Sequence, residues 1–119
     1  KNMIASQIKV RIPLWMNEGL AEYLSSNWDT EADMIIRDLA INERIPTIRE
    51  LEYFLAYKGG QSVWRFIASK YGREKIGEIF QSMKRYGNAE KGFEDAIGMD
   101  FEELTEQWHK YIKKESALY

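Results

Sequence analysis

Apolar residues recur along this chain mostly at the three- and four-residue spacing of amphipathic helices. Only residues 1–12 depart from this spacing, because their apolar positions alternate weakly with basic ones, as in an extended segment. The pattern predicts helices over residues 13–25, 30–42, 61–71, 73–84, 88–98 and 100–112, with a short helical turn at 47–50 and a loop at 52–60.

Residues typical of helix starts stand where this pattern predicts them. Pro13 occupies a first helical position, where the fixed backbone angle of proline is favoured. Two runs have the spacing of a capping box, Thr47 with Glu50 and Asp100 with Glu103. These signals agree with the periodicity, so we expect short helices joined by tight turns.

The predicted fold class is mainly α, a compact bundle of six or seven short helices. No linker rich in serine and glycine divides the chain, so we expect one helical domain over residues 1–119, with an extended lead-in at 1–12 and a helical core at 13–114. The chain begins at Lys1 and opens on a polar stretch, from which we expect it to be a piece of a longer protein.

The composition excludes several classes of function. The net charge is −2 and basic residues are scattered among acidic ones, so no basic footprint indicates a nucleic-acid partner. No apolar stretch approaches the roughly 20 residues of a transmembrane helix. The chain has no cysteine, which excludes disulfides and thiolate metal sites but is compatible with any cellular compartment.

The helix predicted at 13–25 is apolar around most of its circumference and carries one narrow acidic stripe. Glu18 and Glu22 lie on this stripe, four residues apart, and like charges at this spacing repel each other. Burying two carboxylates without partners is costly, so they require a cation or strong donors. A metal ion would meet this need; a basic side chain from elsewhere, or partial exposure, is the alternative. Gly19 between them is consistent with close approach of another backbone.

Residues 13–24, PLWMNEGLAEYL, resemble the W-x-N-E-G-x-A-x-Y segment of gluzincin zinc metallopeptidases. This family includes aminopeptidase N relatives and the peptidase-MA-like domains of bacterial proteins. There a His-Glu-x-x-His helix supplies two zinc ligands and the general base, and the glutamate of N-E-G supplies the third ligand. The resemblance implies that Glu18 is a zinc ligand. It also implies that Glu22 and Asn17 lie next to the metal ligands without binding the metal themselves. Glu22 would accept a hydrogen bond from the second ring nitrogen of a ligating histidine.

Residues 56–64, AYKGGQSVW, resemble the Y-x-x-G segment that opens a later helix in the same enzymes. The resemblance implies a catalytic role for Tyr57, whose hydroxyl would donate a hydrogen bond to the oxyanion of the tetrahedral intermediate. Two alternatives remain: Tyr57 as a packed aromatic beside a helix start, and Tyr53 as the donor. Residues 71–75 and 96–108 resemble the C-terminal helices of these domains, so the likeness covers about residues 12–112.

The chain departs from the family in its histidines. It has one, His109, beside Trp108 in the last predicted helix, and no His-Glu-x-x-His run. We interpret His109 as a histidine at the surface or rim. A catalytic zinc takes three protein ligands and a water, so we expect this chain alone to be inactive and to hold no zinc. The resemblance implies that the intact protein carries zinc, hydrolyses peptide bonds, and has its histidine helix a few tens of residues before Lys1.

Two other functions remain open. If the intact protein lacks the histidine helix, the domain is a catalytically dead peptidase-like module that serves binding or scaffolding. If the N-E-G run is a coincidence, the chain is a generic helical module.

Expectations about partners and location follow from the same resemblance. It implies a peptide or protein substrate, allows a neighbouring β-propeller domain, and favours the cell envelope or secretion over the cytoplasm. Without the histidine helix, the apolar side of the first helix would be uncovered, and large exposed apolar patches find partners. We therefore expect self-association through Leu14, Trp15 and their neighbours.

Overall fold

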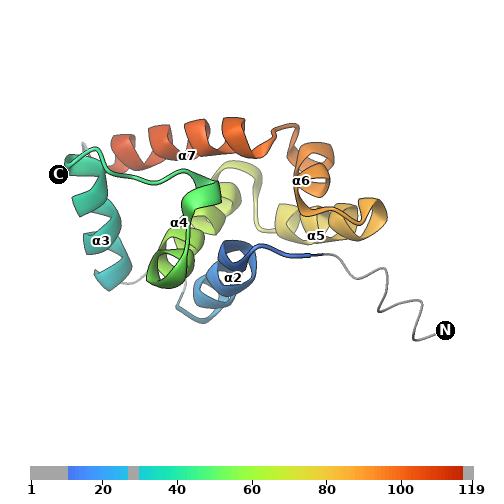
Figure 1. Ribbon diagram of the computed structural model, residues 1–119, viewed down its shortest axis with the longest axis horizontal. Helices are drawn as coiled ribbons and strands as arrows, with labels where there is room; N and C mark the ends of the chain where they lie inside the picture. The colour runs from blue at the N-terminus through green and yellow to red at the C-terminus, as the bar shows by residue number, and fades with distance from the viewer. Residues whose placement is uncertain (1–10, 27–29, 117–119) are drawn as a thin grey trace.

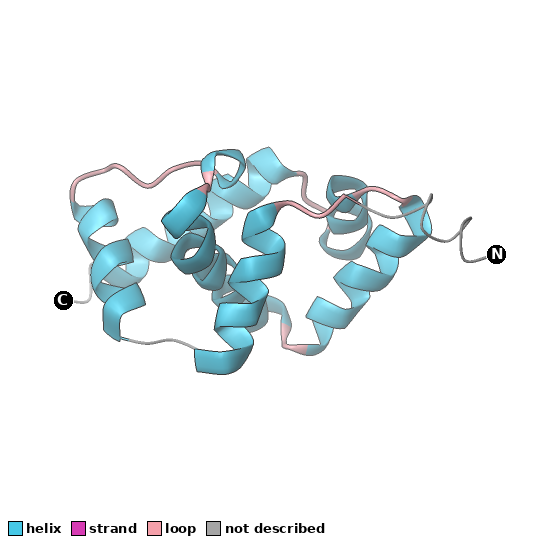
Figure 2. Cartoon of the chain, turned by 60° about the horizontal axis from the view of Figure 1, so that its bottom comes forward, coloured by secondary structure: helices cyan, strands magenta, loops and turns pink. Residues whose placement is uncertain are grey.

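The computed structural model describes residues 11–26 and 30–116, and within them every regular element is helical (Figures 1 and 2). The elements are α2 (Leu14–Ser26), α3 (Thr30–Ile41), the 3-10 turn η1 (Ile48–Glu50), α4 (Tyr53–Tyr71), α5 (Glu74–Tyr86), α6 (Ala89–Ile97) and α7 (Phe101–Ser116). The mainly α fold expected from the sequence is confirmed. The extended lead-in expected at 1–12 lies almost wholly outside the described residues.

Helix α4 is the central element of the fold. It contacts α2, α3, α5 and α7, and its middle is buried. Helices α5 and α6 form a hairpin at one end of the molecule, α3 lies at the other end, and α7 runs between them (Figure 1). Helix α2, which carries the acidic stripe of Glu18 and Glu22, lies on one side of α4.

An aromatic cluster joins α2 to the C-terminal helices. The Trp15 ring lies 6.0 Å from that of Trp64, 5.8 Å from that of Phe93 and 5.9 Å from that of Phe101, measured between ring centroids. Tilted and edge-on contacts at such distances are favourable for aromatic pairs. Trp15 is only 2% exposed, which corrects the expectation that it lies at a self-association contact. Its neighbour Leu14 is exposed.

Helix ends follow the capping signals of the sequence. The backbone N–H of Thr47 donates to Glu50 Oε1 at 2.9 Å, and the backbone N–H of Glu103 donates to Asp100 Oδ1 at 2.9 Å. The bonds from Thr47 lower the pKa of Glu50, because they stabilise its ionised form. The Thr47–Glu50 capping box is therefore confirmed, and at the start of α7 the bond that the Asp100 side chain accepts is present.

Helix α3 ends in a Schellman motif before the proline of the following loop. The backbone N–H of Arg44 donates to the Leu39 carbonyl at 2.8 Å, and that of Glu43 donates to the Ala40 carbonyl at 3.1 Å. Glu43 adopts the left-handed conformation this motif requires, with φ of 53°. Pro46 then follows in a segment without regular structure.

The loop predicted at 52–60 is wrong, because α4 already begins at Tyr53. Gly59 and Gly60 led to that prediction, since glycine is a poor helix former. Inside the folded chain they are the residues that let neighbours approach the helix. A methyl group on Gly59 would lie 2.6 Å from Leu51 Cδ2, and one on Gly60 would lie 2.3 Å from the Trp15 carbonyl oxygen. Tertiary packing thus overrides local propensity here.

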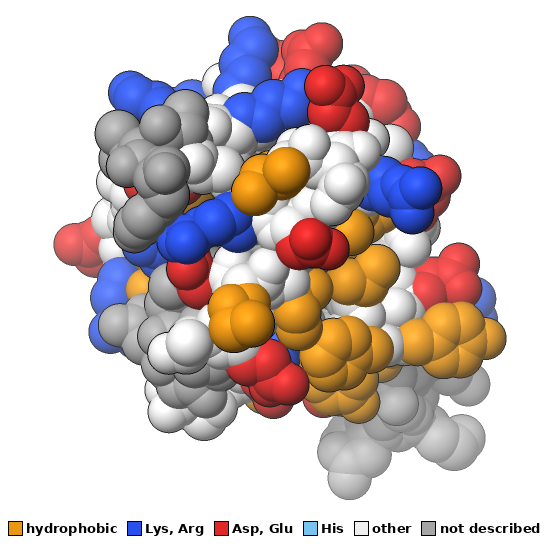
Figure 3. All heavy atoms as spheres, turned by 90° about the vertical axis from the view of Figure 1, so that its left-hand side faces the viewer, with side chains coloured by type: hydrophobic (Ala, Val, Ile, Leu, Met, Phe, Trp, Pro, Cys, Tyr) orange, Lys and Arg blue, Asp and Glu red, His pale blue; other side chains and the backbone are white. Residues whose placement is uncertain are grey.

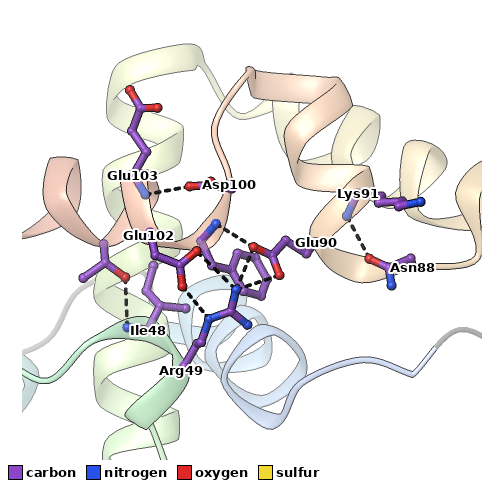
Figure 4. A network of polar contacts seen from close by, with 10 residues as sticks. Ile48, Arg49, Asn88, Glu90, Lys91, Asp100, Glu102 and Glu103 are labelled. Atoms are coloured by element: carbon purple, nitrogen blue, oxygen red, sulfur yellow. Dashed lines mark hydrogen bonds and ion pairs between the residues drawn. The ribbon is translucent and has the colours of Figure 1, made fainter.

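Arg49 connects η1 to the first turns of α6 and α7 (Figure 4). Its guanidinium lies 2.7 Å from Glu90 Oε2 and 2.7 Å from Glu102 Oε2, and 5.3 Å from the centroid of the Phe101 ring. The hydrogen bonds to Glu102 and Glu90 raise the pKa of Arg49, and the bond from Arg49 lowers the pKa of Glu102. This network fixes the loop after α3 against the C-terminal helices.

Candidate functional site

Helices α2 and α4 touch backbone to backbone at a pair of glycines. A methyl group on Gly19 would lie 2.4 Å from the Gly60 carbonyl carbon, closer than real side chains pack. One turn away, the indole Nε1 of Trp64 donates to the Met16 carbonyl at 2.9 Å. We call this contact the α2–α4 seam, defined by Met16, Gly19, Gly60 and Trp64. The close approach expected from a glycine in mid-helix is confirmed.

Glu18 is attached to this seam through its backbone. It directly precedes Gly19, so the position of its Cα atom is fixed by the contact with α4. The side chain of Glu18 is half-buried, and that of Asn17 is exposed. Glu18 therefore combines a backbone next to the α2–α4 seam with a carboxylate side chain that is only partly buried.

Glu22, one turn after Glu18, is met by a buried lysine. Lys58 Nζ lies 3.1 Å from Glu22 Oε1, and Lys58 is only 8% exposed. The same ammonium lies 3.8 Å from Glu31 Oε1 at the start of α3. The sequence left a metal ion and a basic side chain open as partners of the acidic stripe. In this structure Glu22 pairs with a basic side chain, that of Lys58. Whether Glu22 also orients a histidine stays a prediction.

Lys58 was missed by the sequence reasoning because residues 52–60 were assigned to a loop. In a loop, a lysine is expected to be solvated. Once those residues are recognised as helix, Lys58 stands at the start of a run of buried residues that continues to Trp64. A lysine in such a run needs a carboxylate partner when it is buried, and this signal could have linked it to the acidic stripe.

Tyr57 lies on α4, one turn before Gly60. Its side chain is 38% exposed, so it is not fully packed, and its position is within the helix rather than at the helix start. Tyr53, the alternative donor, is the first residue of α4 and is largely exposed. Glu18 directly precedes Gly19 on α2, and Tyr57 lies three residues before Gly60 on α4, so each stands close in sequence to a glycine of the seam. Helix α2 also carries the other two predicted site residues, Asn17 and Glu22.

The residues that the structure describes fit only part of a zinc site. No group of three or more His, Cys, Asp or Glu side chains among them could hold a metal ion. Glu18 is suited to the role of one oxygen ligand, but a catalytic zinc takes three protein ligands. His109 lies on α7, half-buried, with its Nε2 atom 2.8 Å from the Pro46 carbonyl oxygen. A complete site therefore requires ligands from outside residues 11–26 and 30–116.

Comparisons with known proteins cover nearly the whole chain. The sequence model of the Peptidase MA superfamily matches residues 1–114. The chain is also similar to the uncharacterized protein YhcO of Bacillus subtilis (strain 168), with 28% identity over 111 residues, covering 88% of this chain and 34% of that protein. It thus spans about a third of that relative's length. No solved structure matches the chain. Among the helices described, none is long and apolar enough to cross a membrane.

Proposed function

The chain belongs to the Peptidase MA superfamily, and from this premise we propose that it is the C-terminal part of a gluzincin-type zinc metallopeptidase domain. One observation carries the proposal: the glutamate of the N-E-G run, Glu18, is half-buried and held at a backbone contact with the helix that bears Tyr57. A metal ligand has to be positioned precisely, and a seam closed by two glycines allows little movement.

Each predicted site residue has a distinct task in this proposal. Glu18 supplies one carboxylate ligand. Glu22, held by Lys58, orients a ligating histidine through its second ring nitrogen. Tyr57 donates a hydrogen bond from its hydroxyl group to the oxyanion of the tetrahedral intermediate in peptide hydrolysis. When bound, zinc polarises the substrate carbonyl and lowers the pKa of its water toward about 7. The histidine ligands and the general base come from sequence outside this chain.

Zinc binding by a longer protein tests the proposal. The chain is produced together with the sequence that naturally precedes Lys1, and bound zinc is measured by mass spectrometry after dialysis. We expect about one zinc per chain, as a single catalytic site requires. The Glu18→Gln variant should lose it, while Glu106→Gln, at an exposed position of α7, should keep it. Retention of full zinc by Glu18→Gln would contradict the proposal.

The role of Tyr57 is tested by hydrolysis of peptides in the zinc-loaded longer protein. Tyr57→Phe should lower kcat by about 100-fold, the loss typical of an oxyanion donor, without loss of zinc. Tyr53→Phe is the matched control on the same helix and should leave kcat unchanged. A reversed result would assign the donor role to Tyr53.

The alternative is a peptidase-like module without catalysis that serves binding or scaffolding. It is favoured by the single histidine of this chain, which leaves the zinc site dependent on sequence elsewhere. Absence of zinc from both the longer protein and its variants would support this alternative.

A further inference from the structure

The outward side of α3 carries an apolar stripe that the described fold does not cover. Met34 is 65% exposed and Ile41 is 69% exposed, and the two lie seven residues apart, on the same side of the helix. A shallow groove runs along this side and is lined by Met34, Ile35, Arg37, Asp38 and Ile41. Figure 3 looks onto this end of the molecule and shows exposed hydrophobic side chains on it, some of them separated from one another by charged side chains.

Within the part of the chain that the structure describes, the stripe lies away from the side of α3 that packs against the other helices. The buried residues of α3 are Ala32, Ile36 and Ala40, on the opposite side of the helix. Polar residues at positions 34 and 41 would serve a solitary domain equally well. Exposed apolar residues that line a groove indicate a surface that binds a partner.

The charges in this groove are self-complementary, and from this we propose that α3 pairs antiparallel with α3 of a second copy of this chain. A two-fold axis midway between Arg37 and Asp38 sets Arg37 against Asp38 of the second copy. The same axis sets Met34 against Ile41 of the second copy. Both contacts repeat by symmetry, which is what a two-fold interface requires of one surface.

Arg37 would make this contact in addition to those it makes within its own chain. It forms an ion pair with Asp33, one turn earlier. A guanidinium has five N–H donors and can bind two carboxylates at once. Arg49 of this chain does so with Glu90 and Glu102. Because only one helix of each copy takes part, the interface is small and the dimer is weak and dependent on concentration.

Sedimentation velocity of the 119-residue chain, from micromolar to millimolar concentration, tests the dimer. The native chain should shift from monomer to dimer as concentration rises, and Met34→Lys should remain monomeric. Leu14→Lys, at an exposed position of α2, is the matched control and should dimerise like the native chain. A monomer at every concentration would overturn the proposal, as would a dimer that Leu14→Lys abolishes and Met34→Lys preserves.

Charge exchange tests the antiparallel register. Asp38→Arg sets two arginines against each other across the interface, so the dimer should weaken by at least about tenfold. The double variant Arg37→Asp with Asp38→Arg restores opposite charges and should regain most of the lost affinity. Circular dichroism of each variant checks that the helices remain folded. If the folded double variant dimerises no better than Asp38→Arg, the proposed register is overturned.

Discussion

Helices α2 and α3 follow each other along the chain and both contact α4, yet they are held in different ways. Helix α2 meets α4 backbone to backbone, and its large side chains Trp15, Met16 and Tyr23 are buried. Helix α3 buries mainly small side chains and exposes two of its largest apolar ones. The difference teaches that the predicted site lies beside a tightly packed backbone contact, whereas the outer side of α3 is free of such constraints within the described residues.

Closing the space at the seam should produce the largest effect. In Gly60→Ala the new methyl group would lie 2.3 Å from the Trp15 carbonyl oxygen, so α2 has to move away from α4. We expect the free energy of unfolding to fall by about 3 kcal/mol, the upper part of the range for overpacking. Urea denaturation followed by tryptophan fluorescence measures it.

Gly77→Ala is the matched control for that substitution. Gly77 lies in α5 with nothing within 4 Å of the added methyl group. Alanine there should raise stability by about 0.5 to 1 kcal/mol, because it lowers the backbone entropy lost on folding. Equal stability of Gly60→Ala and the native chain would mean that α2 and α4 are not in backbone contact.

Lys58 touches both helices and therefore allows their comparison in a single experiment. Its ammonium is closer to Glu22 of α2, at 3.1 Å, than to Glu31 of α3, at 3.8 Å, and the Glu31 side chain is 68% exposed. Double-mutant cycles with Lys58→Met should give a coupling of about 1 kcal/mol with Glu22→Gln and close to zero with Glu31→Gln. Equal couplings would mean that Lys58 interacts with Glu31 of α3 as strongly as with Glu22 of α2.

The network around Arg49 lies outside both helices. Its contribution to the stability of the folded chain should depend on pH. The pKa of Glu102 is lowered in the folded chain by its hydrogen bond from Arg49, so the unfolded chain binds protons more readily at acidic pH. This contribution is fully present above the unfolded pKa of about 4.3 and is lost as pH falls through the folded pKa.

The measurement is the melting temperature of the native chain and of Arg49→Gln from neutral to strongly acidic pH. The native chain should lose more stability on acidification than Arg49→Gln. Glu50 keeps its lowered pKa in both proteins, because its hydrogen bonds come from Thr47. Parallel curves would show that Arg49 does not stabilise the ionised form of Glu102.

The smallest effect on monomer stability is expected on the outer side of α3. Met34→Lys replaces an exposed side chain, so the free energy of unfolding should change by no more than about 0.5 kcal/mol at concentrations where the chain is monomeric. Thermal denaturation in dilute solution measures it. A clear loss of stability would show that Met34 packs against its own chain.

Sequence reasoning located most of the fold because helix periodicity and capping are local properties. The start of α3 at Thr30 and the capping bonds made by Glu50 and Asp100 were predicted from neighbouring residues alone. The start of α4 was not, because whether Gly59 and Gly60 break a helix depends on what packs against them. The acidic stripe of α2 was visible on a helical wheel. Its lysine partner was not, because Lys58 is distant in sequence and reaches Glu22 only through the fold.

The seam between Gly19 and Gly60 has a consequence for how the chain folds. Helices α5 and α6 are joined by a turn of two residues, so their contact closes a short loop. The two glycines of the seam are separated by the whole of α3 and its flanking segments, and closing a longer loop costs more chain entropy. Contacts of that range are slow to form, so we expect the seam to form after the α5–α6 hairpin. A partly folded chain would therefore have its α5–α6 hairpin while Glu18 and Tyr57 were still apart.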